Sequence, residues 1–141
     1  MLREIAFTGI VLATSPVNVV TNEQPFIDPK SVECLALNMY HEARNQGSAG
    51  LLAVTAVVLN RLKDSRFPDT ICEVIFQGPT RESWKTRNKK ILPTEERKFY
   101  PIRDRCQFSW YCDGKSDIPE QKKTFKRLLI IAESIVYNKL S

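Results

Sequence analysis

LALNMYHEARNQGSAGLLAVTAVVLNRLKDSRFPDTICEVIF, residues 35–76, contains most of the helical signals that decide the fold. A first helix is expected from Pro29 to about residue 45, because Asp28 is a good N-cap, proline suits the first helical position and Gly47 is a typical stop. Ser48 predicts the cap of a second helix over about 49–63. That helix is apolar on nearly all sides, so it is expected to be the buried centre of an α domain.

The rest of the chain predicts two more helices and a small β element. Thr70 and Glu73 form a capping-box pattern for a third helix that closes at Gly78, and Pro119 opens a last helix over about 120–139. Residues 79–105 are polar and weakly periodic, as in functional or mobile loops. Residues 106–114, CQFSWYCDG, predict a short extended segment or hairpin. The last helix has an apolar stripe at helical spacing, made of Phe125, Leu128, Leu129, Ala132, Ile135 and Val136.

These elements predict one mainly α (α+β) domain over residues 29–141, preceded by an N-terminal segment, residues 1–28. That segment begins MLREIAFTGIVLATSPV and resembles a short signal peptide, with a basic start, an apolar stretch and small residues after it. The alternative is a loose N-terminal arm or strand, since Pro16 disfavours cleavage after Ser15. No run of roughly eighteen apolar residues occurs, so no stable membrane span is expected.

Charge is distributed unevenly along the chain. Its net value is +5, yet residues 1–80 carry 6 Lys/Arg against 8 Asp/Glu, whereas residues 81–141 carry 15 against 8. A basic half favours a polyanionic partner, which could be nucleic acid, an anionic membrane surface or an acidic cell wall. A solvated surface is the plainer alternative.

The cysteines and the single histidine limit the metal chemistry. Cys34, Cys72, Cys106 and Cys112 allow three disulfide pairings or four free thiols, and no CxxC pair occurs. His-Glu at 41–42 matches the first half of the HExxH zinc-protease motif, but Asn45 stands where the second histidine is needed. We therefore expect no metal.

Glu42 is the strongest candidate for catalysis. On a helical wheel it falls beside Leu35 at the edge of the core face, while His41 points away and is expected to be exposed. A carboxyl at an apolar boundary loses hydration, which favours its neutral form and suits a general acid. The alternative is a glutamate at the rim of the core, paired with Arg44, Arg61 or another cation.

The segment QFSWYCDG places aromatic rings beside amide and hydroxyl groups, a mixture that suits sugars. Strand alternation assigns Phe108 and Trp110 to the core, and Gln107, Ser109 and Tyr111 to a cleft. Trp84 could add another stacking platform.

Taken together, these pieces resemble the SleB-type cell-wall hydrolases, found as spore-cortex lytic enzymes and in phage lytic genes. The resemblance rests on an ordered set of motifs across residues 33–117: Y-x-E-A-R, a small and apolar helix ending V-x-L-N-R, then F-P-x-T-I and Q-F-S. The pieces ESWK and PTEERKFYP are similar to the phage-type branch.

The resemblance implies a lysozyme-like fold and a lytic transglycosylase that cuts the β-1,4 bond between N-acetylmuramic acid and N-acetylglucosamine. It implies Glu42 as the catalytic residue, no cofactor, and peptidoglycan glycan strands as the partner of a monomer in the periplasm or outside the cell, with no specific nucleic acid. The residues expected to bind substrate are Tyr40, Asn60, Trp84, Gln107, Ser109 and Tyr111.

The sequence alone leaves three points open. Asp113 and Asp117 are candidates for a second carboxylate, although turn roles are common for such residues. Family domains often continue past the last helix into a segment that helps to close the cleft, whereas this sequence ends at YNKLS; either this branch lacks the segment or the chain is short of it. The alternative function is a non-catalytic basic-aromatic module that binds polyanions or cell wall.

Overall fold

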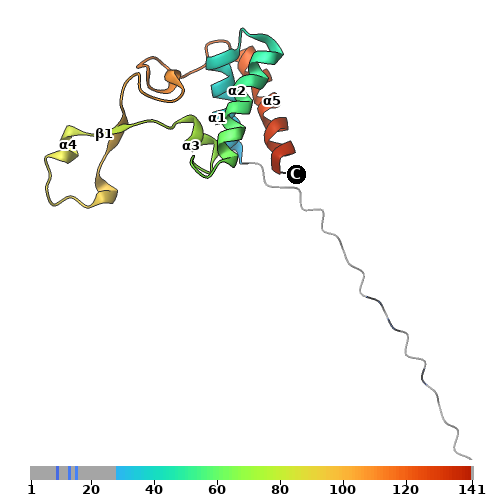
Figure 1. Cartoon of the computed structure of the whole chain (residues 1–141), viewed down its shortest axis with the longest axis horizontal. Coiled ribbons are helices and arrows are strands. Elements are labelled where there is room, and N and C mark those ends of the chain that lie inside the picture. Colours follow the sequence, from blue (N-terminus) through green and yellow to red (C-terminus); the bar gives the residue numbers. More distant parts are fainter. Residues whose placement is uncertain (1–8, 10–12, 14, 16–27, 141) are drawn as a thin grey trace, which may run out of the picture.

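The computed structural model describes residues 28–140 and, ahead of them, residues 9, 13 and 15. The described chain is mainly helical with one small antiparallel sheet, as the sequence predicts (Figure 1). Nearly all of the signal-like stretch lies outside the described residues. The elements run α1 (Pro29–Ala43), α2 (Gly47–Lys63), α3 (Ile71–Ile75), β1 (Thr80–Glu82), α4 (Trp84–Arg87), η1 (Thr94–Glu96), β2 (Phe99–Pro101), η2 (Ser109–Cys112) and α5 (Lys122–Leu140).

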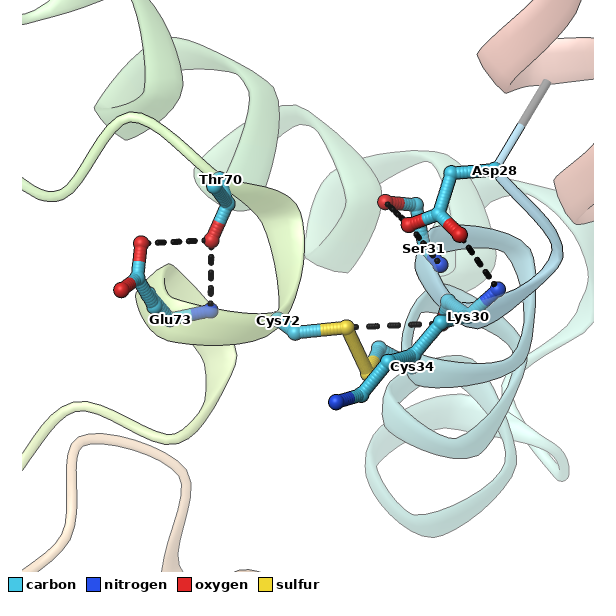
Figure 2. Close-up of a disulfide and its surroundings, with 7 residues drawn as sticks. All are labelled: Asp28, Lys30, Ser31, Cys34, Thr70, Cys72 and Glu73. Atoms are coloured by element: carbon cyan, nitrogen blue, oxygen red, sulfur yellow. Dashed lines mark hydrogen bonds between the residues drawn. A yellow bond between two sulfur atoms is a disulfide. The ribbon is translucent and has the colours of Figure 1, made fainter. Parts of the chain in front are cut away.

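Helix α1 lies at the centre of the core. Its first turn is capped by the Asp28 carboxylate, which accepts from the backbone N–H groups of Lys30 at 3.1 Å and Ser31 at 3.2 Å (Figure 2). Helices α2, α3 and α5 all pack against α1. The stripe predicted for α5 is confirmed, with Leu128, Ala132 and Val136 buried and Phe125, Leu129 and Ile135 partly buried against the same cluster.

A disulfide between Cys34 and Cys72 ties α3 to α1 (Figure 2). The predicted cap of α3 is present, since the Thr70 hydroxyl oxygen accepts from the backbone N–H of Glu73 at 3.2 Å. The helix ends at Ile75, before the predicted stop at Gly78. Gly78 serves a different need, because a Cβ there would lie 2.9 Å from the Cα of Cys106, so only glycine lets the two backbones approach.

Helix α2 is less buried than its sequence predicts. Only Thr55 and Val58 are buried, whereas Leu52 is 64% and Val57 is 42% exposed. Helix α2 packs against α1 and α3. Because these two helices cover only part of its surface, one apolar side of α2 stays uncovered. Ser48 lies within α2 and does not cap it. No helix of the described residues is both long and apolar enough to cross a membrane.

The β element lies earlier in the sequence than predicted. Strands β1 and β2 pair antiparallel with Arg81 opposite Tyr100, inside the section expected to be a loop. The prediction of an extended segment or hairpin over 106–114 is wrong, because Ser109–Cys112 form the short 3-10 helix η2. A disulfide between Cys106 and Cys112 closes the segment after six residues, and the N–H of Gln107 bonds to the Gln77 carbonyl, not to a strand within the segment.

Candidate functional site

The loop of residues 106–118, which we call the aromatic loop, packs on the side of α1 that carries Asn38 and His41. Trp110 donates its indole N–H to the Asn38 side-chain oxygen at 2.9 Å, and both residues are buried. Asn38 lies one helical turn before Glu42, so the two share a face of α1. The loop is therefore anchored beside the candidate acid.

The prediction that His41 is exposed is wrong. Its ring is half-buried and stacks on Trp110 with centroids 4.6 Å apart and planes 15° from parallel. Its Nε2 lies 2.9 Å from the backbone carbonyl oxygen of Asp117, and since a carbonyl only accepts, this nitrogen carries the proton. The helical wheel points His41 away from the apolar face of α1. It could not reveal that the aromatic loop covers that side of the helix.

Glu42 is half-buried near the end of α1, at the edge of the core face where the wheel places it. In the described part of the chain, its carboxylate forms no ion pair or hydrogen bond, and neither suspected cation pairs with it. Arg44 donates to the Tyr40 carbonyl at 3.0 Å and lies over the Tyr40 ring. Arg61 lies over the rings of Phe67 and Phe108. The carboxylate is thus left available for another molecule.

The aromatic loop divides its side chains as predicted, although it is not a strand. Phe108 and Trp110 are 9% and 6% exposed, while Gln107 and Ser109 are exposed. Tyr111 is partly buried and stacks on Phe76 with ring centroids 4.3 Å apart. The 3-10 turn and the Cys106–Cys112 disulfide hold this division in place of a sheet.

The two aspartates of the loop differ in environment. Asp113 accepts from the backbone N–H of Lys115 at 2.8 Å, which is an ordinary turn role. Burial raises the pKa of the Asp117 carboxyl above its usual value of 3.8; the charge of His41 lowers this pKa, and the charge of Asp113 raises it. The backbone carbonyl of Asp117 contacts His41, the neighbour of Glu42 in the sequence, so Asp117 is the loop aspartate tied to the end of α1.

The other predicted substrate residues are placed differently. Tyr40 is only 3% exposed and its hydroxyl accepts from the backbone N–H of Gln121 at 3.0 Å, so it braces α1 against the start of α5. Asn60 is exposed on α2. Trp84 is 65% exposed on α4, in a part of the chain that stands away from the long helices (Figure 1). The structure therefore gathers the loop residues near Glu42 and leaves Trp84 in a separate region.

Sequence reasoning missed the role of Asn38. An uncharged amide on an otherwise apolar helix face, one turn before Glu42, was the available signal, since a buried amide needs a partner. Within the described residues, no three His, Cys, Asp or Glu side chains are grouped so as to hold a metal ion.

The family model described as Cell Wall Hydrolase matches residues 45–139. This match begins just after Glu42, so it covers the aromatic loop and not the candidate acid. No solved structure matches the chain.

Short parts of the chain are similar to curated spore cortex-lytic enzymes. The protein from Oceanobacillus iheyensis is 46% identical over 46 residues, covering 33% of this chain and 17% of that protein. The protein from Halalkalibacterium halodurans is 39% identical over 57 residues, covering 40% and 17%. The one from Bacillus cereus is 36% identical over 62 residues, covering 44% and 24%. The chain thus matches less than a quarter of the length of each of these relatives.

Proposed function

The chain belongs to the cell wall hydrolase family, and from this premise we propose that it cleaves peptidoglycan as a lytic transglycosylase with Glu42 as its single acid and base. The proposed bond is the β-1,4 linkage between N-acetylmuramic acid and N-acetylglucosamine. The observation that carries the proposal is the half-buried Glu42 carboxyl, which neither Arg44 nor Arg61 engages and which lies one turn from the anchor of the aromatic loop.

The proposed reaction needs only one carboxyl group. Glu42 first donates its proton to the glycosidic oxygen as the bond from that oxygen to C1 of the muramyl sugar breaks. The resulting carboxylate then takes the proton from the C6 hydroxyl of the same sugar, and this oxygen forms the new bond to C1. The products are a free hydroxyl on N-acetylglucosamine and a 1,6-anhydro ring, and Glu42 is again protonated.

Hydrolysis is the chemical alternative at the same site. Ordinary glycosidases use two carboxyl groups, and a water molecule replaces the C6 hydroxyl as the attacking group in the second step. Asp117 is the candidate for the second group, because it is partly buried on the loop that His41 holds against α1. The mass of the products separates the two reactions.

In this proposal the exposed Gln107 and Ser109 bind the sugar hydroxyl and acetamido groups, and the edge of Tyr111 contacts a ring face. Tyr40 positions α1 and does not touch substrate, since its side chain is buried. Asn60 and Trp84 contact parts of the strand farther from the cleaved bond.

We also propose that the protein acts outside the cytoplasm. Both cysteine pairs are disulfide-bonded, and disulfides persist in oxidising compartments. Peptidoglycan lies in such a compartment. The relatives reported above are bacterial, so the phage origin suggested by ESWK and PTEERKFYP stays a prediction.

Mass spectrometry of the soluble products from purified peptidoglycan tests the proposal, with wild type, Glu42→Gln and Glu33→Gln compared. Glu33 is an exposed glutamate on the same helix, so its variant controls for the loss of one carboxylate from α1. We expect anhydro-muropeptides, lighter by one water than hydrolysis products, from wild type and Glu33→Gln, and none from Glu42→Gln.

Two other results would redirect the assignment. Products with a reducing end that depend on Glu42 would make the enzyme a hydrolase. No products from the wild type would favour the non-catalytic binding module.

A further inference from the structure

Residues 79–103, which we call the arm, form the segment that stands away from the long helices (Figure 1). The side chains of the arm enclose a cleft of about 630 Å³. It opens between α4 and the β1–β2 pair. Arg81, Arg87 and Arg103 line it together with Trp84 and Tyr100. None of these residues belongs to the Glu42 face.

The cleft continues toward the aromatic loop. A second hollow of about 300 Å³ shares Tyr100, Pro101 and Arg103 with the first and extends to Tyr111 and Lys115. The two hollows adjoin at these three residues, and together, as what we call the groove, they extend from α4 to the aromatic loop. Glu42 lines neither hollow, so the groove lies apart from the candidate acid and reaches the aromatic loop that packs beside it.

The cleft is lined by more cationic than acidic side chains. Among the described residues, Glu82 is the only acid that lines the cleft, and its carboxylate is paired with Arg97 at 2.8 Å, with the two side chains only 18% and 23% exposed. Arg81 and Arg87 line the cleft and form no ion pair within the described residues, whereas the Arg103 Nε lies 3.8 Å from the Asp104 carboxylate, with both of these side chains mostly exposed. A guanidinium holds a carboxylate through two parallel hydrogen bonds.

The groove also offers aromatic faces. Trp84 and Tyr100 are 65% and 60% exposed and line the same cleft, so their rings form an exposed aromatic surface there. Tyr100 lies directly opposite Arg81 in the strand pair, so a ring and a guanidinium share one face of the ribbon. Sugar rings stack on aromatic faces, while their acidic substituents pair with arginine.

We propose that this groove binds the acidic, peptide-bearing part of a peptidoglycan strand and holds it while the strand reaches Glu42. The inference rests on the proposed function, because it concerns the same substrate. Single-stranded nucleic acid would also suit arginines and aromatic rings. Membership of the cell wall hydrolase family and the continuity of the groove with the aromatic loop favour the glycan.

Titration of Trp84 fluorescence with soluble peptidoglycan chains tests the proposal, in a Glu42→Gln background and at about 0.15 M salt, where long-range attraction is screened. We expect saturable binding that weakens about tenfold or more in Arg87→Gln and Tyr100→Ala, the loss expected for one charged hydrogen bond or one stacked ring. Lys89→Gln and Phe99→Ala are matched controls, since both residues are exposed on the arm and do not line the cleft. Trp84→Phe must abolish the signal.

Two further probes identify the ligand group. Chains whose carboxyl groups have been amidated are expected to bind about tenfold more weakly, and a thymidine oligonucleotide is expected to bind more weakly than the chains. Equal binding by Arg87→Gln and Lys89→Gln, equal binding of amidated chains, or tighter binding of the oligonucleotide would each overturn the proposal. Because binding is read without cleavage, wild type that fails to cut peptidoglycan would reject the proposed function and leave the groove standing.

Discussion

The indole nitrogen of Trp110 lies 2.9 Å from the side-chain oxygen of Asn38, across 72 residues of sequence and in the buried interior. This bond fixes the aromatic loop to α1 one turn before Glu42. Asn38 is fully buried, and its Nδ2 has no partner among the described residues. The single bond from Trp110 is thus all that compensates the side chain for lost water.

Trp110→Phe is expected to lower the free energy of unfolding by about 1–3 kcal/mol, because it leaves the buried Asn38 oxygen unsatisfied. Urea denaturation measures the loss. Trp84→Phe is the control, since Trp84 is mostly exposed and its replacement should change the free energy of unfolding by no more than about 0.5 kcal/mol. Equal effects of the two substitutions would show that the Asn38 bond contributes nothing.

The two disulfides are expected to stabilise the fold unequally. Cys34–Cys72 joins residues 38 apart and Cys106–Cys112 joins residues 6 apart. Loop-closure entropy in the unfolded chain then gives about 4 kcal/mol for the first and about 2 kcal/mol for the second. Thermal and urea unfolding of the two double alanine variants should show this order.

The loss of peptidoglycan cleavage in the two variants is expected to follow the opposite order. The Cys106–Cys112 disulfide encloses Gln107 and Ser109, so its loss is expected to reduce peptidoglycan cleavage more than its effect on stability implies. The Cys34–Cys72 disulfide lies at the other end of α1 from Glu42, and its removal should spare cleavage at temperatures where the variant stays folded. Greater loss of cleavage from the Cys34–Cys72 variant would contradict this division.

Most of the helices and the position of Glu42 could be predicted from the sequence. The helices follow from local signals: Asp28 and Pro29 start α1, Thr70 caps α3, and the stripe from Leu128 to Val136 orients α5. Glu42 was placed at the edge of the core because a helical wheel needs only neighbouring residues. Family membership, expected from the ordered motifs, is confirmed.

What the sequence could not predict depends on contacts between distant residues. The bond of Trp110 to Asn38 and the contact of Asp117 with His41 each span more than 70 residues, so no local pattern reveals them. The strand pair of the arm was missed because β pairing needs a partner, and residues 80–82 are too few to show alternation. The exposed side of α2 likewise depends on how many neighbours surround it.

The exposed lysines of the arm are expected to act at long range. Neutralising Lys89 and Lys90 should lower binding to whole cell walls at low salt more than it lowers activity on soluble fragments, since both side chains are exposed and neither lines the cleft. Co-sedimentation with walls at two salt concentrations, beside an assay on soluble fragments, measures both effects. Equal losses in the two assays would reject a separate role in attraction.

Asp117 is expected to make the stability depend on pH in the acidic range. Because burial raises its pKa above 3.8 in the folded protein, the folded state holds the proton more strongly than the unfolded state. The free energy of unfolding therefore falls as the pH rises from about 3.8 through the folded pKa. Asp117→Asn keeps the shape without a charge, so it should be more stable than wild type at pH 7, and this advantage should shrink as the pH falls toward 3.8.

Urea denaturation of wild type and Asp117→Asn at a series of pH values checks this prediction. The backbone carbonyl of residue 117, which accepts from His41, is retained in the variant, so the anchor of the loop is not removed with the charge. A variant that is less stable than wild type at pH 7 would mean that the Asp117 carboxylate stabilises the fold. The electrostatic effect of His41 on the carboxylate would then outweigh the cost of its burial, the reverse of the order expected from its surroundings.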